Sequence, residues 1–195
     1  ALFGIRLLTS FLSTEQYGEL ALGMTVGSFI YTTFLGPLSN GISRYFSLAV
    51  RKNDTNNYLE AVRNIIVLVS FLLLILSIIG ISFLVAIGYS KWIYTKWISL
   101  AISSLLFGIL SSYTDIINAI ENASRHRRIV AFHKALSVWL RFLGAALFLS
   151  IFGISSANAI IGQALAMLII LLSQSYFFLR NLKPNKNLNI LNKNS

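Results

Sequence analysis

Long apolar stretches alternate with short polar ones along this chain, and two of them form a hairpin. Residues 97–120 and 129–152 are predominantly apolar, and a basic turn at 121–128 joins them. At about 1.5 Å per helical residue, each stretch can cross a hydrocarbon core of about 30 Å. Because a backbone in lipid must satisfy its own hydrogen bonds, we predict that both stretches are membrane-spanning helices.

Polar and small residues inside this hairpin recur at steps of three and four, which places them on one helical face. The first stretch carries Ser104, Gly108, Ser111, Asp115, Asn118 and Asn122, and the second carries Lys134, Ser137, Arg141 and Gly144. A helix surrounded by lipid does not collect its polar groups in this way, whereas a helix that lines a bundle interior or a watery cavity does. We therefore predict that both stripes face inward.

Four further apolar stretches, 1–12, 18–50, 61–87 and 158–179, extend the pattern. The first is about 18 Å long as a helix, too short to span, so we expect the sequence to begin inside a transmembrane helix. In the second, Pro37 is predicted to kink the helix because it lacks a backbone donor and clashes with the Thr33 carbonyl. The third is nearly all aliphatic, and we predict that its face around Leu74 contacts lipid. A polar stripe in the second stretch comprises Ser28, Thr32, Gly36, Ser39, Ser43 and Ser47.

These stretches predict an all-α fold, a polytopic transmembrane helix bundle of about six spans with the first one truncated. The bundle covers residues 1–180, and the polar segment 181–195 is predicted to be an exposed tail or linker. In the turn at 13–17, we expect Glu15 with Tyr17 and Gly18 to cap the second span. We predict that the helices holding Ser39 and Ser111 line the interior of the bundle.

Composition supports a membrane protein and orients it. The chain is 56% hydrophobic and 11% charged, against about 25% charged in soluble domains. Its net charge of +10 is concentrated in alternate loops. One side carries Arg44, Arg51, Lys52, Arg63, Arg125, Arg127, Arg128, Lys134, Arg180, Lys183, Lys186 and Lys193, whereas the other carries Lys91 and Lys96. The positive-inside rule then places the loops near Asn56 and Ser124 and the tail in the cytoplasm, and Ser13, Ser90 and Ser155 outside.

Several chemistries are excluded or left without support. The sequence has no cysteine, which excludes disulfides and thiolate metal ligands, and its two histidines do not suggest a structural zinc site. No nucleophile–histidine–acid grouping, paired carboxylates or phosphate-binding loop is recognisable. We predict a protein that is not an enzyme, uses no cofactor or metal and does not bind nucleic acid.

Several residues of the chain form a combination that is typical of a known family. Arg6 in the first stretch is followed by Glu15, Tyr17 and Gly18 at the opening of the second, which ends in GISRYFSLA with Gly41 and Arg44. Residues 118–128 and the Phe152–Gly153 pair belong to the same combination. Together they resemble the bacterial polysaccharide exporters, namely the O-antigen flippases within the multidrug/oligosaccharidyl-lipid/polysaccharide exporter superfamily, and the resemblance covers essentially the whole chain.

The resemblance implies two helical lobes around a cavity that opens to alternate sides of the bacterial inner membrane, and this chain corresponds to the N-terminal lobe. It implies flipping of undecaprenyl-pyrophosphate-linked oligosaccharide for O-antigen, capsule or exopolysaccharide export. Its expected partners are that lipid-linked oligosaccharide, membrane lipids, the C-terminal lobe and a polysaccharide polymerase. Alternatives are a cation-coupled drug antiporter, which should have a more acidic cavity, a membrane-embedded glycan polymerase or transferase, which should have a large external loop, and a scaffold without transport.

The candidate substrate-binding residues are Arg6, Arg141, Arg44, Asn40 and Asn118. Arg141 lies near the middle of its span, where it either contacts a phosphate or pairs with Asp115 or a backbone carbonyl. Arg6 has the same alternatives, whereas Arg44 is also placed to snorkel to lipid phosphates. Asp115 either binds a coupling Na⁺ or H⁺ or neutralises an arginine. We expect His126 and His133 to be interfacial and inert.

Overall fold

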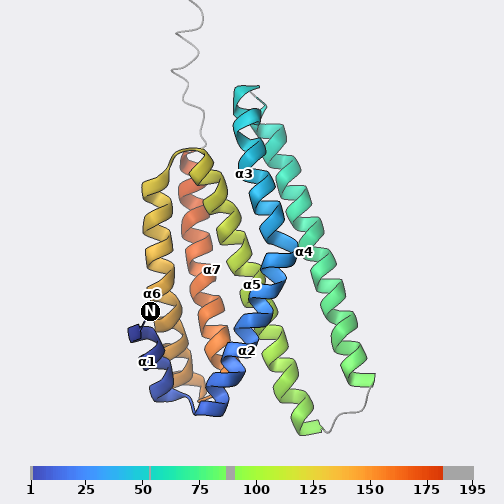
Figure 1. The fold of residues 1–195 in the computed structure, drawn as a ribbon, viewed down its shortest axis with the longest axis vertical. Helices are drawn as coiled ribbons and strands as arrows, with labels where there is room; N and C mark the ends of the chain where they lie inside the picture. Colours follow the sequence, from blue (N-terminus) through green and yellow to red (C-terminus); the bar gives the residue numbers. More distant parts are fainter. Residues whose placement is uncertain (1, 53, 87–90, 182–195) are drawn as a thin grey trace, which may run out of the picture.

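The computed structural model describes residues 2–52, 54–86 and 91–181, and all its elements are helical (Figure 1). They are α1 (Leu2–Phe11), α2 (Thr14–Ile30), the π-helical segment η1 (Tyr31–Leu35), α3 (Gly36–Arg51), α4 (Thr55–Ala86), α5 (Lys91–Ala123), α6 (Arg127–Phe152) and α7 (Ser156–Asn181). The all-α prediction is confirmed for these residues. The predicted outer turn at Ser90 and the tail from residue 182 onward lie outside them.

Five helical segments in the described part of the chain are long and apolar enough to cross a membrane. They are Thr14–Arg51, which comprises α2, η1 and α3, together with Thr55–Ile75, Lys96–Ala123, Arg127–Phe152 and Ser156–Phe178. They indicate a membrane protein. The short α1 precedes them and packs against α6, so it corresponds to the predicted partial first span.

Helix α7 is the centre of the bundle, a position that its sequence pattern did not reveal. It lies between α5 and α6 and packs along both of them (Figure 1). Ala159, Ile160 and Ala164 of α7 are completely buried. The α5–α6 hairpin is therefore joined through α7 over most of its length, and its inward stripes reach a space that α7 also lines.

Glycine pairs allow two of the helix crossings to be close. Gly144 of α6 and Gly162 of α7 face each other, and a Cβ added to either would collide with the other's carbonyl oxygen. Gly27 of α2 and Gly108 of α5 meet in the same way, because a Cβ on Gly108 would lie 3.0 Å from the Gly27 carbonyl oxygen. Small residues are the usual means by which membrane helices approach each other closely.

The predicted irregularity at Pro37 takes the form of a π-helical turn. Since Pro37 has no N–H, the Thr33 carbonyl has no donor at the position four residues later. The chain widens before the proline, and the Gly36 N–H donates to the Tyr31 carbonyl, five residues back. Single π-turns inside α-helices are a recognised way to accommodate such a defect.

This π-turn also changes which residues face inward. Thr32 is exposed, and its predicted stripe mate Ser39 is buried. One extra residue rotates everything after it by about 100°, so Asn40 and Arg44, not Ser39, continue the exposed polar line of Thr32. The predicted single stripe is wrong in this respect, although the prediction that Ser39 lies in the interior is confirmed.

Helix α4 is the most peripheral of the long helices, as its aliphatic sequence predicted. Leu74 is 52% exposed, and Val62 and Leu73 are the buried apolar residues of this helix in the described structure. Large exposed apolar side chains follow its polar first turns, among them Val67, Leu68, Phe71, Leu72, Ile78 and Ile79. A face of this kind is suited to lipid.

Two helix termini differ from the predicted turns. Ser13, not Glu15, caps α2: its hydroxyl accepts from the Gln16 N–H, and the Gln16 side chain accepts from the Ser13 N–H. The basic turn is also shorter than 121–128, because α5 continues to Ala123 and α6 begins at Arg127. The predictions overlooked the capping box and the helical propensity of the residues that flank each turn.

The turn between α5 and α6 is a Schellman motif. The His126 N–H donates to the Glu121 carbonyl and the Arg125 N–H to the Asn122 carbonyl, at 2.9 and 3.1 Å. Arg125 occupies the left-handed position at φ 63°, where glycine is usual. This turn, the α3–α4 turn and the end of α7 lie at one end of the bundle, opposite the α1–α2 and α6–α7 turns (Figure 1). The predicted cytoplasmic loops thus share one end, and the side of the membrane on which it lies remains a prediction.

Candidate functional site

A polar cavity of about 110 Å³ lies between α5, α6 and α7, and we call it the Arg141 pocket. Its lining is Ser111, Thr114, Asp115 and Asn118 from α5, His133, Lys134, Ser137 and Arg141 from α6, and Met167, Ile170 and Gln174 from α7. Both polar stripes of the hairpin therefore contribute to one cavity. Arg141, Asp115 and Asn118, three of the candidate residues, are brought together in it.

Arg141 has a partner that the sequence did not suggest. Its guanidinium carbon lies 4.9 Å from the centre of the Phe107 ring, a cation–π distance. No ion pair within 4.0 Å joins Arg141 to Asp115 among the described residues. The Phe107 ring of α5 is itself buried, so Arg141 combines a half-buried position with an aromatic neighbour.

Asn118 and Gln174 link α5 to α7 at one edge of this pocket. The Gln174 Nε2 donates to the Asn118 Oδ1 at 2.9 Å, and both side chains are buried. The Gln174 Oε1 is also buried and has no hydrogen-bond partner. One turn beyond Asn118, Glu121 is 1% exposed, and neither of its carboxyl oxygens has a hydrogen-bond partner in the described part of the chain.

The prediction that His133 is interfacial and inert is wrong as to its position. Its ring is 1% exposed, and Nδ1 and Nε2 lie 2.9 and 3.2 Å from the Ile129 carbonyl oxygen and the Ser173 hydroxyl. Phe132 and Phe177 meet its ring edge-on. His133 thus connects α6 to α7 beside the pocket, whereas His126 is exposed in the turn.

The other three candidate residues lie outside the Arg141 pocket. Arg6 on α1 is exposed, as are Asn40 and Arg44 on α3. The structure therefore does not place Arg6 and Arg141 in one cavity within this chain. Arg6, Asn40 and Arg44 instead present polar groups on the outer surface of the bundle.

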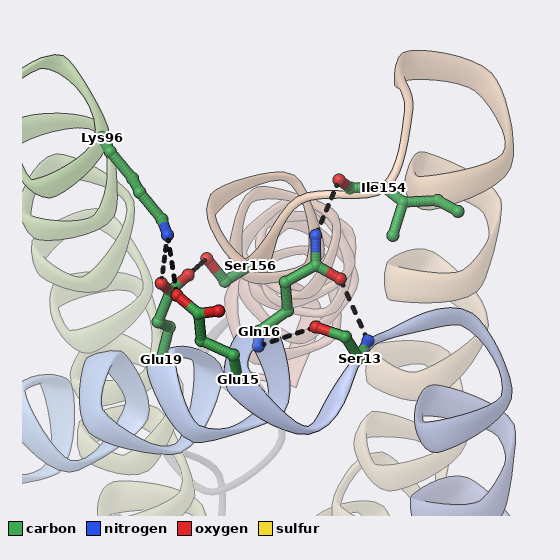
Figure 2. Close-up of polar contacts among 7 residues, drawn as sticks. All are labelled: Ser13, Glu15, Gln16, Glu19, Lys96, Ile154 and Ser156. Atoms are coloured by element: carbon green, nitrogen blue, oxygen red, sulfur yellow. Dashed lines mark hydrogen bonds and ion pairs between the residues drawn. The ribbon is translucent and has the colours of Figure 1, made fainter. Parts of the chain in front are cut away.

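A second polar group, which we call the Glu19 cluster, comprises Glu15, Gln16, Glu19, Lys96 and Ser156 at the opposite end of the bundle (Figure 2). The Lys96 Nζ lies 2.5 Å from the Glu19 Oε1 and 3.6 Å from the Glu15 Oε1. The Ser156 hydroxyl donates to the other Glu19 oxygen at 2.7 Å. Helices α2, α5 and α7 are thus joined through one carboxylate.

The cluster also holds the α6–α7 turn. The Gln16 Nε2 donates to the Ile154 carbonyl at 3.2 Å, while the Gln16 Oε1 completes the α2 capping box (Figure 2). A cavity of about 510 Å³ lies beside these residues, bordered by Ser99 and Ser155. Every polar side chain drawn in Figure 2 takes part in at least one of these contacts.

The sequence analysis missed Glu19, Lys96, Glu121 and Gln174. Nothing local connects Glu19 with Lys96, since they lie on helices separated by α3 and α4. Glu121 did leave a signal: it follows Asn118 by three residues, which puts both side chains on one face of α5. Gln174 interrupts the apolar sequence of α7, an arrangement that in a membrane helix indicates an inward position.

The Arg141 pocket can hold small polar species. A water molecule takes about 30 Å³ of liquid volume, so the cavity has room for a few waters or one small ion but not for a sugar. No group of three or more His, Cys, Asp or Glu residues suited to a metal occurs in the described part of the chain. Comparisons of the chain with family models, curated proteins and solved structures found no match.

Proposed function

We propose that this chain is one lobe of a bacterial inner-membrane exporter that flips lipid-linked oligosaccharide by alternating access. The observation that carries the proposal is an exposed polar line on the helix from α2 through α3. Its members are Thr25, Ser28, Thr32, Asn40, Arg44 and Ser47. All of them fall within a segment that is long and apolar enough to cross a membrane.

Polar groups at this depth are unfavourable against hydrocarbon. An arginine at the centre of a span costs at least about 2.5–3.5 kcal/mol by insertion scales. Arg44 lies seven residues before the end of α3, so its cost is smaller. Hydroxyls in lipid bond to their own helix. Thr25 and Thr32 do so, to carbonyls of the preceding turn, but Asn40 and Arg44 extend side chains beyond what such bonds can satisfy. A second lobe enclosing a watery cavity would provide the missing polar surroundings.

The charge of this surface suits the proposed substrate. Arg44 belongs to this line, and Arg6 is exposed on α1, which packs against α6; arginine binds phosphate oxygens through two parallel hydrogen bonds. We assign Arg44 and Asn40 to the face that meets the pyrophosphate, and we assign Arg6 to a second contact from α1. Arg141 and Asn118 border a pocket inside the lobe, and we assign them to maintaining its packing and charge rather than to sugar contact.

The test compares two arginines at matched depth in the cells from which the chain comes. Arg44 lies on α3 and Arg63 on α4, at similar distances from the turn between these helices, and both are exposed. Arg63 is paired with Glu60 at 3.7 Å. We expect Arg44→Ala to lower surface polysaccharide at least tenfold and Arg63→Ala to leave it unchanged, with lipid-linked precursor accumulating in the inner leaflet.

Protein level in the membrane is measured beside polysaccharide. Arg44→Lys should retain part of the export, because lysine keeps the charge but loses the two-pronged geometry. Normal polysaccharide in both Arg44→Ala and Arg6→Ala would reject the cavity role of this surface. Equal losses in the Arg44 and Arg63 variants at normal protein level would point to a general basic-surface effect and reject it as well.

A further inference from the structure

Glu121 is a buried carboxyl group without a partner. It lies in the last turn of α5, where the Schellman motif fixes its backbone, and its side chain is almost completely inaccessible. Neither carboxyl oxygen receives a hydrogen bond. A buried carboxylate without a donor or a counter-charge is strongly unfavourable, and the described residues offer Glu121 neither.

Further acceptor oxygens belong to the same part of the structure. Asn118 precedes Glu121 by one turn on the same face of α5, and its Oδ1 already accepts from Gln174. The Gln174 Oε1 is the remaining buried acceptor without a donor in the described residues. We call Asn118, Glu121 and Gln174 the Glu121 seam. It offers oxygens and, within the described residues, no free positive charge. Two of its members, Asn118 and Gln174, line the Arg141 pocket, and Glu121 lies one helical turn beyond Asn118.

The charged groups on the surrounding elements do not pair with Glu121. They are Asp115 on α5, Arg127, Arg128, His133, Lys134 and Arg141 on α6, Arg125 and His126 in the turn, Arg44 and Arg51 on α3, and Glu60 and Arg63 on α4. Within the described residues no ion pair of 4.0 Å or less joins any of them to Glu121. The described side chains of α7 bring no lysine, arginine or histidine.

We propose that the Glu121 seam binds a small monovalent cation, either a proton on the carboxyl group or a sodium ion shared between Glu121 and the Gln174 and Asn118 amide oxygens. Hard cations prefer oxygen ligands, and the cavity lined by Asn118 and Gln174 admits a small ion or a few waters. A sodium ion would neutralise the carboxylate and give the Gln174 oxygen a partner, whereas a proton would neutralise the carboxylate alone. The proposal does not depend on the transported substrate.

The test measures thermal unfolding of the purified protein in detergent at pH 8 and pH 5.5. Each pH is run in sodium chloride and in choline chloride of equal ionic strength. If sodium is bound, the unfolding midpoint at pH 8 should be about 2–8 °C higher in sodium chloride than in choline chloride. If a proton is bound, the midpoint in choline chloride should be higher by a similar amount at pH 5.5 than at pH 8. In Glu121→Gln the corresponding rise should disappear, because the neutral amide needs no cation.

Two variants make the result specific. Glu60→Gln removes an exposed acid on α4 and should respond as the wild type does. Gln174→Met removes the amide oxygen but keeps a similar side-chain length. If sodium is bound, the sodium concentration needed for half of the stabilisation should rise at least fivefold, whereas stabilisation by a proton should not change. This variant replaces Glu121→Gln as the test if Glu121→Gln does not fold. A wild type whose midpoint ignores both cations, or a Glu121→Gln protein that keeps the full rise, would overturn the proposal. Since the readout is stability, its failure leaves the export experiment unaffected.

Discussion

Two glutamates in this protein are similarly buried, yet their surroundings are opposite. In the Glu19 cluster, Lys96 contacts one carboxyl oxygen and Ser156 donates to the other, so the charge is balanced within the chain. In the Glu121 seam, the described residues provide no donor to either oxygen of Glu121 and no partner to the Gln174 Oε1. Both carboxyl oxygens of Glu19 therefore have a hydrogen-bond or ion-pair partner, whereas those of Glu121 have none among the described residues.

This difference separates a structural role from a binding role. Buried polar groups in folded proteins are almost always hydrogen-bonded, because an unpartnered one retains its full desolvation penalty. A network such as the Glu19 cluster, in which every buried polar atom has a partner, can join helices α2, α5 and α7 without a ligand. A network with unpartnered buried polar atoms becomes stable when it binds a ligand that provides the missing partners. The predictions below test this contrast by removing partners at each place.

The largest effect is expected for Lys96→Met, which leaves Glu19 buried without its counter-charge. We expect the free energy of unfolding to fall more than in any other variant described below, but less than for a pair buried on both sides, because the Lys96 side chain is 38% exposed and solvent screens its charge. Chemical unfolding of the protein in bicelles with increasing SDS measures this change.

The matched control is Glu15→Gln. Glu15 contacts the same lysine at 3.6 Å, but its side chain is 82% exposed, so the loss should stay below about 0.5 kcal/mol. Adding Glu19→Gln to Lys96→Met should recover part of the lost stability, since it removes the unpaired charge. Equal losses for Lys96→Met and Glu15→Gln would show that the Glu19 pair has no structural role.

An intermediate effect is expected at the seam, for Gln174→Ala. The Asn118 Oδ1 then loses its donor, and a cavity opens between α5 and α7, so stability should fall by about 2 kcal/mol. The double variant Asn118→Leu with Gln174→Leu removes both polar partners and should unfold close to the wild type, because an apolar pair fills a similar volume. A double variant less stable than Gln174→Ala would mean that this hydrogen bond is structural like those of the Glu19 cluster.

A smaller loss is expected for Ser156→Ala, which removes the second hydrogen bond to the Glu19 carboxylate. Bonds to charged groups contribute about 1.5–3 kcal/mol, and the remaining Lys96 contact should keep the change near the lower value. Ser99→Ala alters an exposed hydroxyl that borders the same cavity and should have no measurable effect. The SDS midpoints of the two variants give the comparison directly.

The smallest expected change is a gain, in Arg125→Gly. Arg125 adopts the left-handed conformation in the Schellman turn beside Glu121, where a residue with a Cβ is disfavoured by about 1–2 kcal/mol. Glycine should relieve most of this, and its higher entropy in the unfolded state should reduce the net gain to about 0.5–1 kcal/mol. If the variant were less stable, the Arg125 side chain would have to make a contact that outweighs the backbone strain.

Much of the candidate site was predictable from local pattern. Steps of three and four placed Ser111, Asp115 and Asn118 on one face of α5, and Lys134, Ser137 and Arg141 on one face of α6, and all of them border the Arg141 pocket. The aliphatic α4 was correctly predicted to be peripheral. These features depend on helical periodicity and on the hydrophobicity of single segments, so neighbouring residues along the chain suffice to predict them.

Tertiary structure alone decided which side chains and helices contact each other. That Phe107 faces Arg141, that Lys96 meets Glu19 and that α7 lies between α5 and α6 depend on how the helices pack, which their own periodicity does not specify. The π-turn before Pro37 likewise turned Asn40 outward and Ser39 inward, because one added residue shifts the helical face. The sequence by itself thus determined the helices and their polar faces, and packing determined which polar group obtained a partner and which, like Glu121, did not.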